Sequence, residues 1–66
     1  MRKRELGSRL RRRRKELGLS VVQLANRACC TTKSVFNWEQ GSHAPHVGKA
    51  IAIAKVLKIS VEELFG

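Results

Sequence analysis

Small polar and basic side chains gather in one short stretch of the chain. Thr32, Lys33 and Ser34 come directly before Val35, and Asn37 follows two residues later. Hydroxyl and amide groups can hydrogen-bond to base edges in the major groove of DNA, and a lysine can reach a guanine acceptor or a phosphate. The residue types therefore predict a base-contacting surface made of Thr32, Lys33, Ser34 and Asn37.

Two short helices are expected to hold this surface. Ser20 is a good N-cap for the first helix, which ends near Cys29, and Thr31 is the N-cap candidate for the second, which ends at Gly41. Only about three residues separate the two helices. So short a connection forces the helices to cross steeply and to share one small core, which is the geometry of a helix-turn-helix. We place this unit at residues 21–40.

Apolar residues at helical spacing predict three further helices around this pair. The first covers about residues 5–17, a later one covers residues 47–57, and Ser60 begins a short last helix that reaches Phe65. No segment alternates with a period of two for long enough to predict a strand. The sequence therefore predicts a compact all-α fold of five helices, with residues 1–66 forming a single domain.

The predicted core consists of the apolar residues that face inward on these helices. Trp38 belongs to it because it lies one turn after Val35, and Cys30 is interpreted as a small core hydrophobe beside a tolerated Cys29. The other residues assigned to the core are Leu6, Leu10, Leu17, Leu24, Ala25, Ala28, Val47, Ala50, Ile51, Ala54, Leu57 and Leu64.

Positive charge is the strongest feature of the composition. The formal net charge is +9, and nine of the fourteen lysines and arginines lie between Arg2 and Lys15. A dense positive surface attracts polyanions, because the release of counterions from phosphates favours binding. Charge alone does not separate DNA from RNA or from an anionic membrane. Any single arginine of this run has an equally good interpretation as part of a solvated helix face.

Targeting segments and membrane spans are not expected. The longest fully apolar stretch, residues 50–54, is far too short to span a bilayer, and the basic N-terminus leads into more charge rather than an apolar segment. The two adjacent cysteines are no disulfide framework and fit a reducing compartment. We therefore expect a cytoplasmic protein that has no membrane partner.

Catalysis and metal binding find little support in the residue types. Cys29 and Cys30, with His43 and His46, are the candidates for a metal site, but vicinal cysteines converge poorly on one ion. The two histidines are better explained as loop residues that face phosphate. No nucleophile, base and orienting group can be assembled, so we expect no enzyme, no cofactor and no metal.

The helix-turn-helix stretch carries a specific pattern over residues 19–41, LSVVQLANRACCTTKSVFNWEQG, after a basic helix and before P-x-V…A-x-x-L-x-I-S-x-E-E-L. With these residues, the chain over residues 6–65 resembles the Cro/phage-repressor (XRE-like) helix-turn-helix family of DNA-binding transcriptional regulators. The resemblance implies a lambda-repressor-like DNA-binding domain, in which residues 32–40 read the major groove as a dimer on a pseudo-palindromic operator. It implies a sequence-specific regulator of transcription that binds double-stranded DNA, most often a repressor. The matching positions are Leu19, Ser20, Leu24, Ala25, Val35, Trp38, Glu39, Gly41, Pro45, Ala54, Leu57, Ser60 and Leu64.

The resemblance also assigns roles to individual residues. Arg14 matches the family arginine that forms an ion pair with the glutamate found here as Glu39. Two copies are expected to meet near the last helix, where Val61 and Phe65 lie beyond the main core. The N-terminus of the second helix offers unpaired backbone amides near Ser20 and Val21, a ready phosphate site. We expect phosphate contacts from Ser20, Val21, Thr31, Gln40, Ser42 and His43.

Several positions depart from the family pattern. Val21 replaces a glutamine that commonly touches a phosphate, and His46 replaces the customary Ser or Thr cap. Cys29 and Lys58 stand where glycine is usual, so a positive φ there would cost about 1 kcal/mol. Phe36 lies on the outward side of the recognition helix, and its side chain has two main possible roles and one lesser one. It contacts a thymine methyl or sugar, or it contacts a protein, or it is simply partly packed.

A second function class stays open, an antitoxin-like or partner-binding protein whose DNA binding is autoregulatory. Its partner would be a toxin or an antirepressor. An exposed apolar patch beyond a dimer seam would favour this class, and Val22, Phe36 and Phe65 are the candidates for it. RNA binding through the basic N-terminal helix is disfavoured, because that helix offers no exposed aromatic side chains on which bases could stack.

Overall fold

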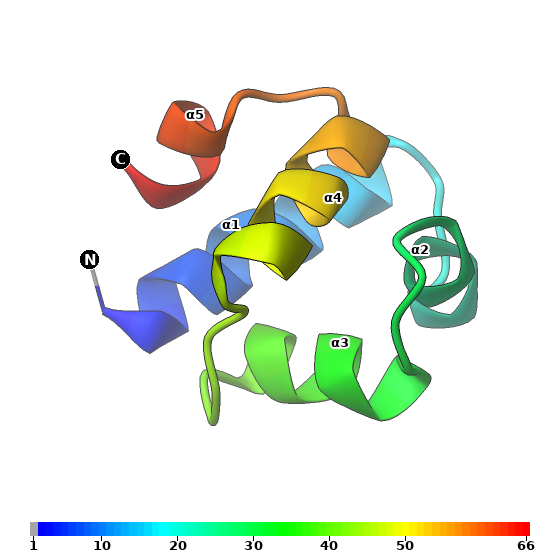
Figure 1. The fold of residues 1–66 in the computed structure, drawn as a ribbon, viewed down its shortest axis with the longest axis horizontal. Helices are drawn as coiled ribbons and strands as arrows, with labels where there is room; N and C mark the ends of the chain where they lie inside the picture. The colour runs from blue at the N-terminus through cyan, green and yellow to red at the C-terminus, as the bar shows by residue number, and fades with distance from the viewer. Residues whose placement is uncertain (1) are drawn as a thin grey trace.

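The computed structural model describes residues 2–66, which form five α-helices and no strand (Figure 1). They are α1 (Lys3–Glu16), α2 (Val21–Arg27), α3 (Thr32–Gln40), α4 (Val47–Leu57) and α5 (Val61–Phe65). The predicted all-α fold of five helices is confirmed, although α1 begins two residues before the position that the apolar pattern indicates. None of these helices is long and apolar enough to cross a membrane.

Side-chain caps determine where most of the helices begin. The Ser20 hydroxyl accepts a hydrogen bond from the Gln23 amide at 3.0 Å, and Gln23 Oε1 accepts one from the Ser20 amide at 2.8 Å, so α2 begins with a reciprocal capping box. Thr31 and Ser60 cap α3 and α5 through single bonds of 3.1 and 2.9 Å to backbone amides. α4 lacks such a cap, because the His46 side chain makes no bond to its first turn.

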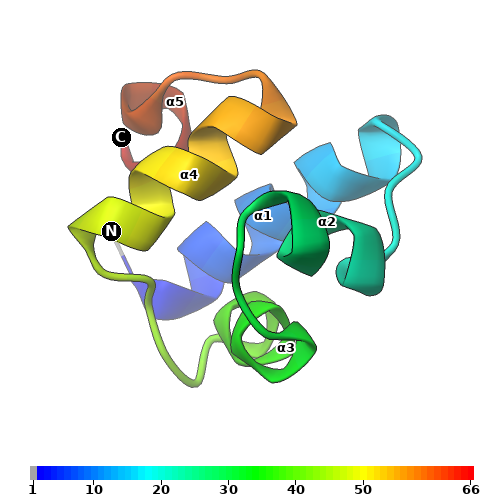
Figure 2. The same ribbon diagram turned by 45° about the vertical axis from the view of Figure 1, so that its right-hand side comes forward.

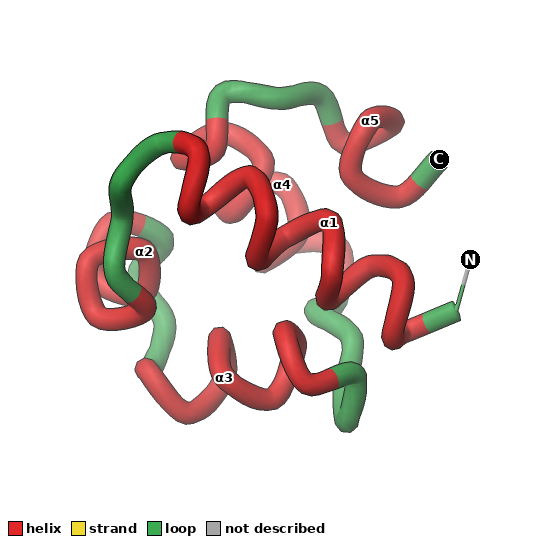
Figure 3. Tube along the Cα trace, turned by 180° about the vertical axis from the view of Figure 1, so that it is seen from behind, coloured by secondary structure: helices red, strands yellow, loops and turns green. Residues whose placement is uncertain are grey.

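The helices enclose one core. α1 and α4 lie on opposite sides of it, since α4 is on the near side in Figure 1 and α1 is on the near side in Figure 3, which shows the molecule from behind. α3 closes one edge of the core, α2 closes one end, and α5 packs against α1 and α4 (Figure 2). Every helix contributes to the largest fully buried side chains, which are Leu10, Leu24, Val35, Ile53, Leu57 and Leu64.

α4 is rotated relative to the predicted orientation. Val47 and Ile51, which the sequence pattern places inward, are 76% and 43% exposed, so their assignment to the core is wrong. Ile53 is fully buried in their place and belongs to the core cluster. The other α4 residues assigned to the core are buried as predicted and fit either orientation of the helix: Ala50, Ala54 and Leu57.

Among residues 2–66, two residues with side chains adopt the left-handed backbone conformation. Cys29, in the turn between α2 and α3, has a φ of 56°, and Lys58, at the C-terminal end of α4, has a φ of 57°. A Cβ in this region is strained by about 1 kcal/mol. Lys49 ties the strained turn to α4, because its Nζ donates to the carbonyl oxygen of Cys29 at 2.6 Å.

Candidate nucleic-acid interface

α2, α3 and the turn between them form the helix-turn-helix. Ala25 and Val35 lie at the crossing of the two helices and are 1% and 0% exposed. The Cys30 amide donates to the Ala25 carbonyl oxygen at 2.9 Å, which ties the turn to the end of α2. A small residue on α2 and a branched one on α3 let the helices cross closely, as the short connection predicts.

α3 divides its residues between the core and solvent. Val35 and Trp38 are buried, whereas Phe36 is 55% exposed. The surface predicted to contact bases is split by this division. Thr32 and Lys33 are exposed, and Ser34 and Asn37 are half-buried.

Two half-buried residues of α3 line a hollow between this helix and the loop that follows it. Ser34 and Asn37 line one side of the hollow, and His43, His46 and Lys49 are among the residues that line the rest. The Ser34 hydroxyl also accepts a hydrogen bond from Thr31 Oγ1 at 2.9 Å. The structure therefore brings two of the predicted base-contacting residues together with a predicted phosphate-contacting one, His43.

The residues predicted to contact phosphate lie at the start of α2, at the start of α3 and at or after the end of α3. At the start of α2 the Ser20 amide is bonded to a side chain of its own capping box, so it is not unpaired, contrary to the expectation from sequence. The amides of Val21 and Val22 are the ones for which the helix supplies no acceptor. The remaining residues of this group are all exposed: Thr31, Gln40, Ser42 and His43.

A buried ion pair joins α1 to the last turn of α3. Arg14 Nε donates to Glu39 Oε2 at 2.7 Å, and Arg14 Nη2 donates to Glu39 Oε1 at 2.9 Å. Arg14 Nη1 also donates to the carbonyl oxygen of Leu19 at 2.8 Å, and the arginine is only 8% exposed. The hydrogen bonds that Arg14 donates to Glu39 raise the pKa of Arg14, so the guanidinium stays charged. This pair holds α3 in a defined orientation against α1.

Gly7 brings α1 and α3 into backbone contact at the same end of α3. A Cβ at this position would lie 2.4 Å from the carbonyl oxygen of Trp38 and 2.7 Å from that of Glu39. Any side chain there would push the two helices apart. Sequence reasoning missed this residue, and the signal available was a glycine on the inward face of α1, next to Leu6.

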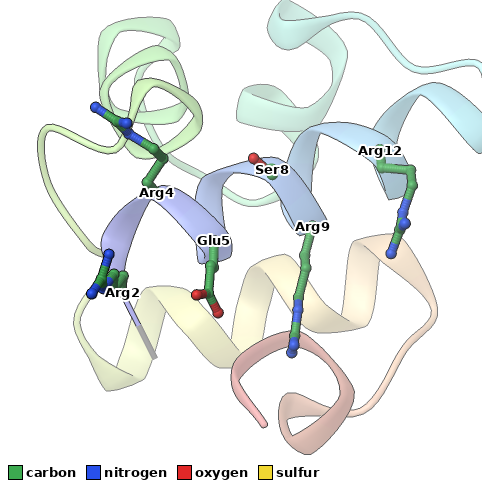
Figure 4. A pocket seen from close by; sticks show the side chains of 6 residues that line it. All are labelled: Arg2, Arg4, Glu5, Ser8, Arg9 and Arg12. Atoms are coloured by element: carbon green, nitrogen blue, oxygen red, sulfur yellow. The ribbon is translucent and has the colours of Figure 1, made fainter.

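The arginine run of α1 contains bonded and free side chains. Arg13 Nε donates to the carbonyl oxygen of Leu57 at 2.9 Å, and its Nη1 pairs with Glu16 at 3.3 Å. Within residues 2–66 no hydrogen bond or ion pair holds the side chains of Arg11 and Arg12, and both are exposed. Figure 4 shows the outer side of α1, where an open basic surface is lined by Arg2, Arg4, Glu5, Ser8, Arg9 and Arg12.

The cysteines and histidines form no metal site in the part of the chain that the structure describes, where no three His, Cys, Asp or Glu side chains lie close enough to share an ion. Cys29 is exposed, and Cys30 is half-buried against the core rather than fully inside it. Burial raises the pKa of the Cys30 thiol, which keeps it neutral as a packing group.

Comparison with known proteins agrees with this geometry. A family model described as helix-turn-helix matches residues 10–64. The chain is similar to SinR, a master regulator for biofilm formation, in a crystal structure in complex with DNA: the two are 27% identical over 92% of this chain and 98% of that one, with a TM-score of 0.88. It has the same fold as the clp gene regulator ClgR from Corynebacterium glutamicum, with 21% identity over 96% of this chain and 67% of that one and a TM-score of 0.90. No curated protein matches its sequence. The chain therefore belongs to the Cro/phage-repressor (XRE-like) helix-turn-helix family of DNA-binding transcriptional regulators.

Proposed function

We propose that this protein is a sequence-specific repressor of transcription that inserts α3 into the major groove of double-stranded DNA. The observation that carries the proposal is the exposed polar surface of α3, held in one orientation by the buried pair of Arg14 and Glu39. The net charge of +9 supplies attraction to phosphates. The crystal structure of the similar protein SinR contains DNA, which supports DNA as the partner of this chain. Repression needs only occupancy of a site, which a small binding domain can provide.

Specific and nonspecific contacts are assigned to different residues in this proposal. Base edges are contacted by Thr32, Lys33, Ser34 and Asn37, which lie on α3 and on the hollow beside it. Phosphates on either side of the groove are contacted by groups at the start of α2, at the start of α3 and after its end. These are Ser20, Val21, Thr31, Gln40, Ser42 and His43.

A second copy of the chain is proposed to bind at an apolar groove between α4 and α5. Val47, Ile51 and Val61 leave 76%, 43% and 39% of their surface exposed there. The groove contains both residues predicted for the seam, and its lining consists of Pro45, Val47, Ala50, Ile51, Val61 and Phe65. One recognition helix reads only a few base pairs, so two copies on half-sites centred about 34–36 Å apart would provide the specificity of an operator.

A partner-binding role, in which a toxin or an antirepressor controls the protein, is the second candidate. The observation in its favour is that Val22 and Phe36 are 53% and 55% exposed and lie outside the groove of α4 and α5. Single exposed apolar residues are common on protein surfaces, so this observation is weaker than the one that supports DNA binding.

Stoichiometry on DNA tests the dimeric form of the proposal. Analytical ultracentrifugation on one selected operator should show two copies per duplex, with binding curves steep in protein concentration. Phe65→Glu and Val47→Glu should both weaken operator binding more than folding, because a charge in the groove opposes contact between copies. Val47 is the safer position for the fold, since most of its side chain is exposed.

Lys55→Glu is a matched control, because Lys55 is exposed on α4 and does not line the groove. It changes the net charge by more than either groove variant does. It therefore distinguishes a lost contact between two copies from a weaker electrostatic attraction to DNA. A tight complex of one copy per duplex that is indifferent to both groove variants would contradict the dimer and its seam.

A further inference from the structure

Phe36 is an exposed apolar side chain on the surface of α3. It is 55% exposed, whereas the other large apolar residues of this helix, Val35 and Trp38, are buried. Residues three and four positions away are its neighbours on the helix surface. All four of them are polar: Thr32, Lys33, Glu39 and Gln40. Phe36 is therefore not part of a larger apolar patch on its own helix.

Phe36 also lies outside the two surfaces to which contacts have been assigned above. It lines neither the hollow that contains Ser34 and Asn37 nor the groove between α4 and α5. The position of this side chain is thus explained neither by the core nor by the proposed seam.

A DNA duplex can supply the missing partner. Base edges in the major groove present hydrogen-bond donors and acceptors and one apolar group, the C5-methyl of thymine. A phenyl ring neither donates nor accepts at those edges, so the methyl group is the feature it can recognise. We propose that Phe36 is a specificity-determining residue that packs against the C5-methyl group of a thymine in each half-site. This inference rests on the proposed function, because it needs the exposed surface of α3 to lie in the major groove.

Replacing thymine with deoxyuridine tests the contact directly, since this change removes the methyl group and keeps every hydrogen-bonding atom. Each thymine of a selected operator is replaced in turn, and binding of the full chain is measured by fluorescence anisotropy. At one thymine per half-site, the wild-type protein should lose about fourfold in affinity, the factor expected for one methyl group withdrawn from an apolar contact. Phe36→Ala should bind the two duplexes equally. Lys33→Ala, as the matched control, should bind more weakly but keep the fourfold ratio.

Three results would overturn the inference. One is a wild-type protein that binds every deoxyuridine duplex as well as its thymine counterpart. Another is a Phe36→Ala variant, shown by circular dichroism to be folded, that keeps the wild-type preference for thymine. The third is a Phe36→Ala variant that changes the number of copies per duplex, which would place the ring in a protein contact. Selective binding without a methyl effect would leave the proposed function standing, whereas the absence of selective binding to any duplex would overturn both.

Discussion

Arg14 of α1 and Glu39 of α3 are joined by two parallel hydrogen bonds of 2.7 and 2.9 Å, and their side chains are only 10% and 6% exposed. The planar guanidinium matches both carboxylate oxygens at once, so the pair holds the two helices at one distance and one angle. Glu39 lies in the last turn of α3. The pair therefore sets the orientation of the helix that we propose to read DNA.

Removing one partner of this pair should be far more harmful than removing both. Glu39→Gln should lower the free energy of unfolding by about 3–5 kcal/mol, because Arg14 is left charged and buried with no opposite charge. The double variant Arg14→Met with Glu39→Leu should recover most of that loss. Urea unfolding followed by circular dichroism measures both values. A loss below about 1 kcal/mol in Glu39→Gln would mean that the pair behaves as an exposed salt bridge.

Base-contacting residues should affect specific binding alone. Lys33→Ala and Asn37→Ala are each expected to weaken binding to a selected operator by about 1–3 kcal/mol, because each removes hydrogen bonds to base edges. Binding to random duplexes should change little, and the fold should be retained. Lys55→Ala is the control, since Lys55 is exposed on α4 rather than α3. Equal losses on operator and random duplexes would show that Lys33 and Asn37 only hold phosphates.

The free arginines of α1 should affect all duplexes alike. Replacing both Arg11 and Arg12 with glutamine should weaken binding to any duplex and flatten the dependence of log K on log salt by up to about 0.9 for each phosphate that is no longer neutralised. Titrations at several salt concentrations measure this slope. Lys55→Gln with Lys58→Gln removes two exposed charges from α4 and its C-cap and provides the matched control. An unchanged slope in the Arg11 and Arg12 variant would assign these side chains to a solvated helix face.

The left-handed residue after α4 should be improved by glycine. Lys58→Gly is expected to stabilise the protein by about 1 kcal/mol, because glycine adopts a φ near 57° without the Cβ penalty. Lys55→Gly, at an exposed position inside α4, should destabilise the protein by a similar amount. Thermal unfolding measures both, and a change of this size corresponds to about 4–8 °C in a domain of this length. A lower Tm for both variants would show that glycine relieves no backbone strain at residue 58.

Local chemistry made most of this fold predictable, because the N-caps Ser20, Thr31 and Ser60 and the helical spacing of leucines act over a few residues. The face of α4 was not predictable in the same way. Either Ile51 or Ile53 can face the core together with the alanines and the leucine of this helix. Only packing against the rest of the core determines that Ile53 is the buried one. The position of Gly7 against α3 likewise depends on how two distant segments meet.

In the candidate interface, too, some features follow from local sequence and others depend on tertiary packing. The exposure of Thr32 and Lys33 follows from helical spacing around Val35 and Trp38. The half-burial of Asn37 depends instead on the loop after α3, which lines the same hollow and which no local pattern describes.

Selection of bound sites from random duplexes tests the central claim, that α3 reads base sequence in double-stranded DNA. The full chain should enrich a pseudo-palindromic sequence whose half-sites are centred about 10–10.5 base pairs apart. A folded variant that combines Lys33→Ala with Asn37→Ala should enrich a different or more degenerate sequence while still binding DNA. A wild-type pool that stays random after repeated rounds, or a variant pool that matches the wild-type pool, would contradict the account.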